Sequence, residues 1–338
     1  MDFVKVFREK WSPPQARTEP FTGQTILVTG ANTGLGLEAA KKIAALDASI
    51  LIFTTRSQAK ADATKQIIET SLSASKSQKT RLVPMILDMS TANGVLDFVR
   101  ELGSITNELD AAILNAGVSM PKHSVTVDGF EETIAINTVN TMLLADLLSP
   151  IMTTTAKVKH VQTHMTIVSS RTAAQPGSMP TAQIVTSDTP LRASSETINF
   201  PPGVAGGLVQ YGRSKLYLEY ALRRLVTSPE LYDEQEKPRV VINTVCPGMT
   251  VSNLARSYES WITKTAQKIL FALFAKSTAD GANSYLTALL QGEESMGQLW
   301  ANDQIQPEWA NLTSADGRKL GNSVWKELRI YIDKVTKT

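Results

Sequence analysis

The chain has 338 residues, 42% of them hydrophobic and 20% charged, which suffices for one large globular α/β domain. A net charge of +2, without a dense block of lysine and arginine, argues against a nucleic-acid partner. The single cysteine, Cys246, excludes an intrachain disulfide and favours a reducing compartment. Three histidines without a companion cysteine cluster argue against a metal site.

The sequence also bears on location. It contains no run of about 18 apolar residues, the length that a membrane span needs. Its N-terminus lacks the apolar core of a secretory signal. We therefore predict a cytoplasmic protein without a transmembrane segment, with peripheral membrane association as the alternative. Cys246 follows the apolar run 240–245, which favours a core residue over a nucleophile.

Residues 1–22 are predicted to form an N-terminal extension. Phe3, Val4 and Phe7 make one apolar face of a short helix there. Docking of this helix onto the body of the protein is the simpler interpretation, and contact with a membrane or a partner is the alternative.

From residue 23 onward, short apolar strands alternate with amphipathic helices. Fully apolar strands separated by helices are typical of a parallel sheet that is covered on both faces. We therefore predict a single Rossmann-like, doubly wound α/β domain over residues 23–325 and a C-terminal tail, 326–338. Strands are expected at residues 25–29, 49–54, 81–87, 111–114, 165–168 and 240–245, and helices at 34–46, 59–71, 95–102, 131–151 and 211–227.

Two segments break this alternation. Residues 171–210 are rich in small and polar residues without a clean period, and such a stretch inside a compact domain is usually functional or disordered. The second segment, 249–280, carries an apolar and partly basic helix at 258–275. We interpret this helix as a substrate lid, with a dimer contact or a membrane surface as alternatives.

A glycine-rich turn follows the first strand, in the order Thr29-Gly30-Ala31-Asn32-Thr33-Gly34-Leu35-Gly36. Glycine permits the tight turn and lets the backbone approach a pyrophosphate, which then meets the N–H groups of the following helix. We expect a dinucleotide to bind here, with Gly30, Asn32, Thr33, Gly34, Leu35 and Gly36 in contact with it.

The end of the second strand, Phe53-Thr54-Thr55-Arg56, indicates which dinucleotide binds. No acid is present there for the ribose hydroxyls of NAD. The guanidinium of Arg56, with the hydroxyls of Thr54, Thr55 and Ser57, suits a 2′-phosphate, so we predict NADP(H). A solvated surface arginine is the alternative.

Asp88 and Met89 end the third strand, on the side where such sheets bind ligands. The Asp88 carboxylate is suited to accept a hydrogen bond from the adenine amino group. The alternative role, as N-cap of the next helix, is compatible with the first.

Tyr211 and Lys215 are four residues apart on a predicted helix, so their side chains share one face. We expect the ammonium of Lys215 to lower the pKa of Tyr211, which would exchange a proton with a substrate oxygen. Ser170, at the end of a strand, would hydrogen-bond the same oxygen. Asn137, on the long helix, would hold a backbone group and a water that links Lys215 to solvent.

Taken in this order, the motifs resemble those of the short-chain dehydrogenases/reductases over about residues 23–300. The resemblance implies that Asn137, Ser170, Tyr211 and Lys215 are catalytic. It implies further cofactor contacts at Tyr211, Lys215 and the remaining motif positions. These positions are Asn115, Ala116 and Gly117, which steady the central sheet beside the adenosine, and Pro247, Gly248 and Ser252 near the nicotinamide, with Thr250 as the alternative to Ser252.

The residues of the glycine turn, together with Arg56, resemble those of the NADP-preferring, retinol-dehydrogenase-like branch of that family. Similar chains also occur as tailoring reductases of fungal secondary metabolism. The resemblance thus implies an NADP(H)-dependent oxidoreductase that interconverts a ketone or aldehyde and an alcohol on a lipophilic or secondary-metabolite substrate, as a homodimer or homotetramer. A non-redox isomerase, dehydratase or cyclase and a non-catalytic binding protein are the alternatives.

The chain departs from the family pattern at one place. Ser170 and Tyr211 are 41 positions apart, whereas the family commonly uses a much shorter connection. Because the insert 171–210 lies between two predicted catalytic residues, we expect it to border the substrate pocket.

Overall fold

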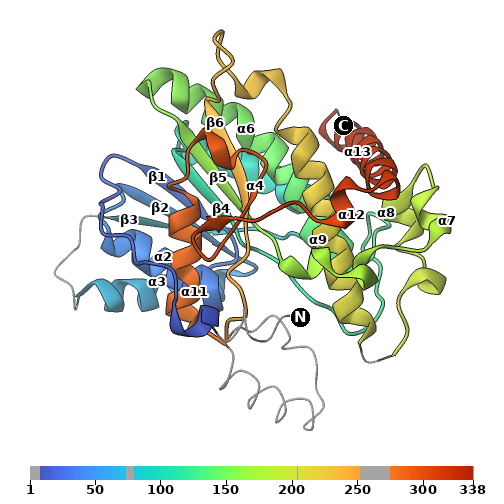
Figure 1. Cartoon of the computed structure of the whole chain (residues 1–338). Helices are drawn as coiled ribbons and strands as arrows, with labels where there is room; N and C mark the ends of the chain where they lie inside the picture. The colour runs from blue at the N-terminus through green and yellow to red at the C-terminus, as the bar shows by residue number, and fades with distance from the viewer. Residues whose placement is uncertain (1–7, 74–79, 204, 252–274, 338) are drawn as a thin grey trace.

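The computed structural model describes residues 8–73, 80–203, 205–251 and 275–337 of the chain (Figure 1). Its centre is an eight-stranded sheet of order β3-β2-β1-β4-β5-β6-β7-β8. All neighbouring pairs are parallel except β7 and β8. The strands are β1 (Thr25–Val28), β2 (Ile50–Thr55), β3 (Arg81–Ile86), β4 (Ala111–Leu114), β5 (Thr163–Val168), β6 (Val240–Val245), β7 (Leu299–Ala301) and β8 (Gln304–Ile305).

The strand order places the ligand crevice. β1 pairs with β2 on one side and with β4 on the other. The chain therefore adds β2 and β3 on one side of β1, and then returns to add β4 and the later strands on the other side. In doubly wound sheets a crevice opens at this reversal, at the carboxyl ends of the strands. The predicted doubly wound parallel sheet with helices on both faces is confirmed.

Helices cover both faces of the sheet, as Figure 1 shows. In β1, Leu27 packs into the cluster that contains α4, α6 and α9, whereas Ile26 and Val28 pack towards α2 and α11. This alternation follows from the two-residue period of a strand. The main helices are α2 (Gly34–Ala45), α3 (Gln58–Ser73), α4 (Ala92–Ile105), α6 (Asn140–Lys159), α9 (Gly206–Leu225), α11 (Thr278–Ala288), α12 (Ala310–Thr313) and α13 (Ala315–Thr336).

The helix predicted at 131–151 is longer than expected and is not uniform. It begins as α5 (Glu132–Ile134), widens into a π-helical turn, η1 (Ala135–Val139), and continues as α6. Glu131 caps its start by accepting a hydrogen bond from the Ile134 N–H at 3.2 Å. Single π-helical turns are frequent at functional sites, and this one carries Asn137.

The segment Glu132–Lys159 is long and apolar enough to cross a membrane, a feature that the sequence prediction overlooked. Its most apolar stretch is 78% buried inside the protein, where it packs on the sheet and on α4 and α9. A buried core helix meets the same length and composition criteria.

The insert 171–210 folds into a chain of short helices. α9 begins at Gly206 rather than at Tyr211. Gly206 packs tightly against the Pro201 carbonyl, and such tertiary contacts outweigh the low helix propensity of glycine. α13 packs on α7, α8 and α9 and runs through residue 325, the predicted end of the domain. The short helices are η2 (Arg171–Ala174), η3 (Pro176–Ser178), α7 (Ala182–Val185), α8 (Pro190–Ala193) and η4 (Thr197–Asn199), and η5 (Pro229–Leu231) and η6 (Glu293–Ser295) lie outside the insert.

The described part of the N-terminal extension docks on the body of the protein. The side-chain amide of Asn283 on α11 donates to the Pro14 carbonyl at 3.0 Å, and the Gln15 N–H donates to Asp303 at 3.1 Å. Phe21 is buried among the residues between α2 and the sheet. Phe3, Val4, Phe7 and most of the predicted helix 258–275 lie outside the described residues.

Candidate active site

A cavity of about 730 Å³ opens at the carboxyl ends of the strands. A smaller cavity of about 80 Å³ adjoins it, since Arg56, Gly117 and Val118 line both. Most of the predicted site residues meet here. The larger cavity is lined by Thr33, Gly34, Leu35, Asn115, Gly117, Ser170, Tyr211, Lys215, Pro247 and Gly248, and the smaller one by Gly30, Asn32, Arg56, Asp88, Met89, Ala116 and Gly117.

The glycine turn is shaped for a close-lying anion. Gly30 and Gly34 have φ angles of +66° and +61°, in the left-handed region that favours glycine. Thr33 precedes α2 without a side-chain cap, and no acid occupies the first helical turn. Neither a cap side chain nor an acid therefore competes for the N–H groups at this helix end, which suit an anionic ligand.

Asn115 fastens the turn to the centre of the sheet. Its amide donates to the carbonyls of Thr29 at 2.9 Å and Gly30 at 3.1 Å, and its oxygen accepts from the Tyr285 hydroxyl at 3.0 Å. A methyl group at Gly36 would lie 2.4 Å from the Asn115 amide nitrogen, so Gly36 contributes close packing although it lines neither cavity. Sequence reasoning missed Tyr285, which reaches this network from α11.

The smaller cavity combines two exposed cations with one acid. Arg56 and Lys60 both line it. Lys60 follows Arg56 by four positions and lies in the first turn of α3. This spacing was a readable signal that the sequence analysis missed. Two of the three hydroxyls predicted beside Arg56 are already engaged, because Thr54 accepts from the Gly30 N–H at 3.1 Å and Thr55 donates to the Ser57 carbonyl at 2.9 Å.

Asp88 does not cap α4. Its carboxylate accepts hydrogen bonds from the N–H and the hydroxyl of Ser90, at 2.9 and 2.7 Å. The cap of α4 is Thr91, whose hydroxyl accepts from the Gly94 N–H at 3.0 Å. The predicted N-cap role of Asp88 is thus wrong; Asp88 lines the smaller cavity, and its contact with the adenine stays a prediction.

Tyr211 and Lys215 share one face of α9 and both line the larger cavity. The Lys215 Nζ lies 5.8 Å from the centre of the Tyr211 ring and donates to the Val168 carbonyl at 2.7 Å. Burial lowers the pKa of Lys215 to about 8. Burial also raises the pKa of Tyr211, and the predicted lowering of that pKa by Lys215 is wrong.

Of the two adjacent serines, Ser170 is the one whose hydroxyl acts on the pKa of Tyr211. Ser170 lowers that pKa and so acts against the effect of burial. Thr172 holds the Ser170 oxygen through its N–H at 3.2 Å and its hydroxyl at 2.9 Å, a support that sequence reasoning did not find. Ser169 is buried, and its hydroxyl has no hydrogen-bond partner in the described ranges.

Asn137 is fully buried in η1 and holds the segment after the Asn115-Ala116-Gly117 motif. Its amide oxygen accepts from the Val118 N–H at 2.9 Å, and its nitrogen donates to the Val118 carbonyl at 2.8 Å and to Ser214 at 3.0 Å. It therefore holds a backbone as predicted, but it does not itself line the cavity.

The far wall of the larger cavity is the turn after β6. Gly248 has a φ angle of +75°, and Pro247, Met249 and Thr250 line the cavity with it. Of the two hydroxyls predicted for this turn, that of Thr250 lies in the described part of the chain. It donates to the Pro247 carbonyl at 3.3 Å. The predicted alternative, Ser252, lies outside the described residues.

Comparison with known proteins places this site in a family. The sequence model of the short chain dehydrogenases matches residues 24–182. The short-chain dehydrogenase/reductase ffsI of Aspergillus flavipes is 30% identical over 330 residues, which cover 96% of this chain and 89% of that protein. The chain belongs to the short-chain dehydrogenase/reductase family. A second relative, phmF of Phaeosphaeria nodorum, is 30% identical over 94% of this chain and 89% of its own length.

Solved structures agree with the fold of a short-chain dehydrogenase/reductase. A 3-ketoacyl-(acyl-carrier-protein) reductase from Brucella melitensis, complexed with NADH, matches 83% of this chain and 97% of its own with a TM-score of 0.57 at 17% identity. A member of unknown function from Caenorhabditis elegans, solved with cofactor, matches 83% and 95% with a TM-score of 0.59 at 17% identity. Family membership makes the chain an oxidoreductase with a nicotinamide cofactor.

The residues present fit such a cofactor. The uncapped start of α2 suits the pyrophosphate, and the glycines of the turn leave room for it. The Gly248 turn forms the opposite wall, next to Tyr211 and Lys215. Among the described residues no group of three or more histidine, cysteine, aspartate or glutamate side chains is placed to hold a metal ion.

Proposed function

We propose that this short-chain dehydrogenase/reductase uses NADP(H) to interconvert a ketone or aldehyde and an alcohol. One observation carries the proposal: Ser170, Tyr211 and Lys215 line the same cavity as the glycine turn. A proton donor, its two supporting groups and a dinucleotide cradle therefore face one space. When bound, the nicotinamide supplies or accepts a hydride at the substrate carbon.

The preference for NADP(H) is supported by the charges at the adenosine end. Arg56 and Lys60 are exposed at the rim of the smaller cavity and suit the 2′-phosphate. Asp88 is on the same rim, but its carboxylate already accepts two hydrogen bonds from Ser90. Both of these bonds end on Oδ1, so Oδ2 is the oxygen that we assign to the adenine amino group.

Proton transfer is assigned to Tyr211. Because burial raises its pKa, Tyr211 is protonated at neutral pH and is ready to donate to a carbonyl oxygen. The Ser170 hydroxyl orients that oxygen, and the charge of Lys215 stabilises the phenolate that remains after donation. The carbonyl carbon gains a hydride, its oxygen gains the tyrosine proton, and an alcohol results. The reverse sequence oxidises the alcohol.

The substrate side of the cavity supports a lipophilic substrate, including a secondary metabolite. Its walls carry the apolar side chains of Val118, Met120, Leu208, Val209 and Met249. The insert 171–210 contributes both apolar and polar lining residues, as expected from its place between Ser170 and Tyr211. Assembly as a homodimer or homotetramer and a cytoplasmic location stay predictions from the sequence.

Titration of the purified protein with NADPH and, separately, NADH tests the proposal, with cofactor fluorescence as the readout. We expect tight binding of NADPH and weak binding of NADH, followed by NADPH oxidation in a screen of lipophilic ketones and aldehydes. Absence of binding to both nucleotides would overturn the proposal. Preference for NADH would overturn the part that concerns the 2′-phosphate.

A further inference from the structure

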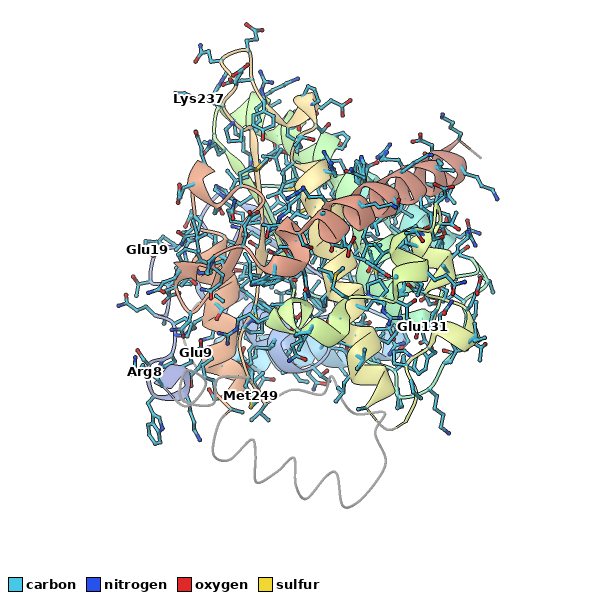
Figure 2. The ribbon with its side chains drawn as sticks, turned by 45° about the vertical axis from the view of Figure 1, so that its right-hand side comes forward. Arg8, Glu9, Glu19, Glu131, Lys237 and Met249 are labelled. Carbon is cyan, nitrogen blue, oxygen red and sulfur yellow. The ribbon has the colours of Figure 1, made fainter. Side chains whose placement is uncertain are left out.

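Three charged side chains from distant parts of the chain converge behind the Gly248 turn. A methyl group at Gly248 would lie 3.3 Å from Lys276 Nζ, 3.4 Å from Glu9 Oε2 and 3.5 Å from Arg171 Nη2. Glu9 comes from the N-terminal extension, Arg171 from the start of η2, shortly after β5, and Lys276 from the segment before α11. Figure 2 shows Glu9 at the same end of the molecule as Met249, the residue after this turn.

The cluster has two cations for one anion, and Arg171, with its side chain 24% exposed, is its partly buried member. Glu9 and Lys276 are 5% and 3% exposed. Glu9 forms a two-pronged ion pair with Arg171, with oxygen–nitrogen distances of 2.5 and 2.6 Å. The Lys276 Nζ has no hydrogen-bond partner within the described part of the chain, and burial lowers its pKa. Glu9 is therefore the counter-charge that keeps one buried and one partly buried cation close together.

Each cation is joined directly to a wall of the active site. Arg171 follows Ser170, and its N–H donates to the thiol of Cys246 at 3.5 Å. The Lys276 backbone pairs with the turn, donating to the Met249 carbonyl at 2.9 Å and accepting from the Val251 N–H at 3.1 Å. The positions of the Ser170 segment and of the Gly248 turn are thus coupled through Glu9.

We infer that Glu9 is a positioning residue for the active site, through which the N-terminal extension holds Ser170 and the nicotinamide-side turn at their working separation. The inference rests on the proposed function for the roles of Ser170 and the turn. Glu9 lines no part of the cavity and acts only through Arg171 and Lys276.

Glu9→Gln removes the counter-charge with little change in shape. Because misplacement of catalytic groups by about 1 Å lowers rates by up to roughly a hundredfold, we expect kcat/KM to fall about tenfold to a hundredfold. KM for the cofactor should rise and kcat should fall. Glu19→Gln is the matched control, since Glu19 belongs to the same extension but is 67% exposed and lies 3.9 Å from Arg17. That variant should behave as wild type.

A second readout needs neither cofactor nor substrate. Cys246 is the single cysteine of the chain, lines the larger cavity and contacts the Arg171 N–H. Its rate of labelling by a thiol reagent reports the packing of this region. We expect labelling several-fold faster in Glu9→Gln than in Glu19→Gln. If the wild-type protein binds neither nucleotide, the proposed function fails and this rate still decides the role of Glu9.

Two further variants separate positioning from general stability. Lys276→Gln in the Glu9→Gln background removes the surplus cation and should restore part of the activity and slow the labelling. Glu9→Asp keeps the charge with a shorter reach and should give a smaller loss than Glu9→Gln; if Glu9→Gln does not fold, Glu9→Asp is compared with Glu19→Gln instead. Wild-type kinetics and labelling in Glu9→Gln, or in Glu9→Asp in its place, would overturn the inference.

Discussion

Lys215 donates a hydrogen bond from Nζ to the backbone carbonyl of Val168 over 2.7 Å. This bond attaches α9 to the end of β5, two residues before Ser170. A buried lysine held by a neutral carbonyl retains its charge at a cost in stability, and burial lowers its pKa to about 8. The burial of Lys215 thus lowers the stability of the folded state, and it also places a cation beside Tyr211.

Tyr211→Phe removes one oxygen and should abolish turnover. Because loss of a positioned acid commonly lowers rates about a hundredfold to ten-thousandfold, kcat should fall by at least that range while NADPH still binds. Steady-state kinetics and fluorescence titration measure the two effects. Tyr217→Phe, on the same helix but bonded to Ser194 away from the cavity, is the control and should keep activity. Equal activity in both variants would contradict the assignment.

Lys215→Met should lose activity without losing stability. Removal of the buried cation stabilises the folded state, whereas loss of the hydrogen bond to the Val168 carbonyl destabilises it. We therefore expect the free energy of unfolding at pH 7 to be unchanged or up to about 2 kcal/mol higher than in the wild type. Denaturant unfolding measures it. A large loss of stability would show that the bond to Val168 outweighs the burial of the charge.

The stability of the wild type and that of Lys215→Met should depend differently on pH. Lys215 has a pKa of about 8 in the folded state, below the ordinary 10.5 of the unfolded state. The destabilisation by its buried charge is therefore complete below pH 8 and disappears as the pH rises from 8 towards 10.5. We expect the stability advantage of Lys215→Met to shrink across this range. A constant difference in unfolding free energy would contradict the lowered pKa.

Arg56→Asp should shift the cofactor preference towards NADH. The change removes a cation from the rim of the smaller cavity and adds an acid suited to ribose hydroxyls. Dissociation constants for both nucleotides measure the shift, which should weaken NADPH binding about tenfold or more, as expected for loss of a charge-assisted hydrogen bond. Lys65→Asp, further along α3 and outside both cavities, is the control. Unchanged NADPH preference in Arg56→Asp would place the 2′-phosphate elsewhere.

Gly36→Ala should impair cofactor binding through packing alone. Its methyl group would lie 2.4 Å from the Asn115 amide and 2.5 Å from the Gly30 carbonyl, so the glycine turn must shift. Gly103→Ala in α4 is the matched control, because nothing lies within 4 Å of that position and alanine there should stabilise the helix by about 0.5–1 kcal/mol. Tight NADPH binding by Gly36→Ala would show that the turn tolerates the shift.

Local sequence patterns predicted much of this protein. The spacing of Tyr211 and Lys215 placed both on one helical face, because neighbours at i and i+4 share a face in any α-helix. The predicted strands at 111–114 and 240–245 match the observed bounds, since a buried parallel strand requires a short apolar run. The helix start at Gly206 was missed because two glycines argue against a helix until their packing is known.

The amino-acid sequence by itself determined the fold class, the glycine turn and the order of the site residues, because each depends on neighbours a few positions apart. Only the tertiary structure decided the contacts between distant segments. Tyr285 meets Asn115 across 170 positions, and Glu9 meets Arg171 across 162. No local period records such pairs, since they arise when the whole sheet brings separate strand ends and the N-terminal extension to one edge. The folding of the whole sheet also buries Tyr211 and Lys215. Burial in turn raises the pKa of Tyr211 and lowers that of Lys215.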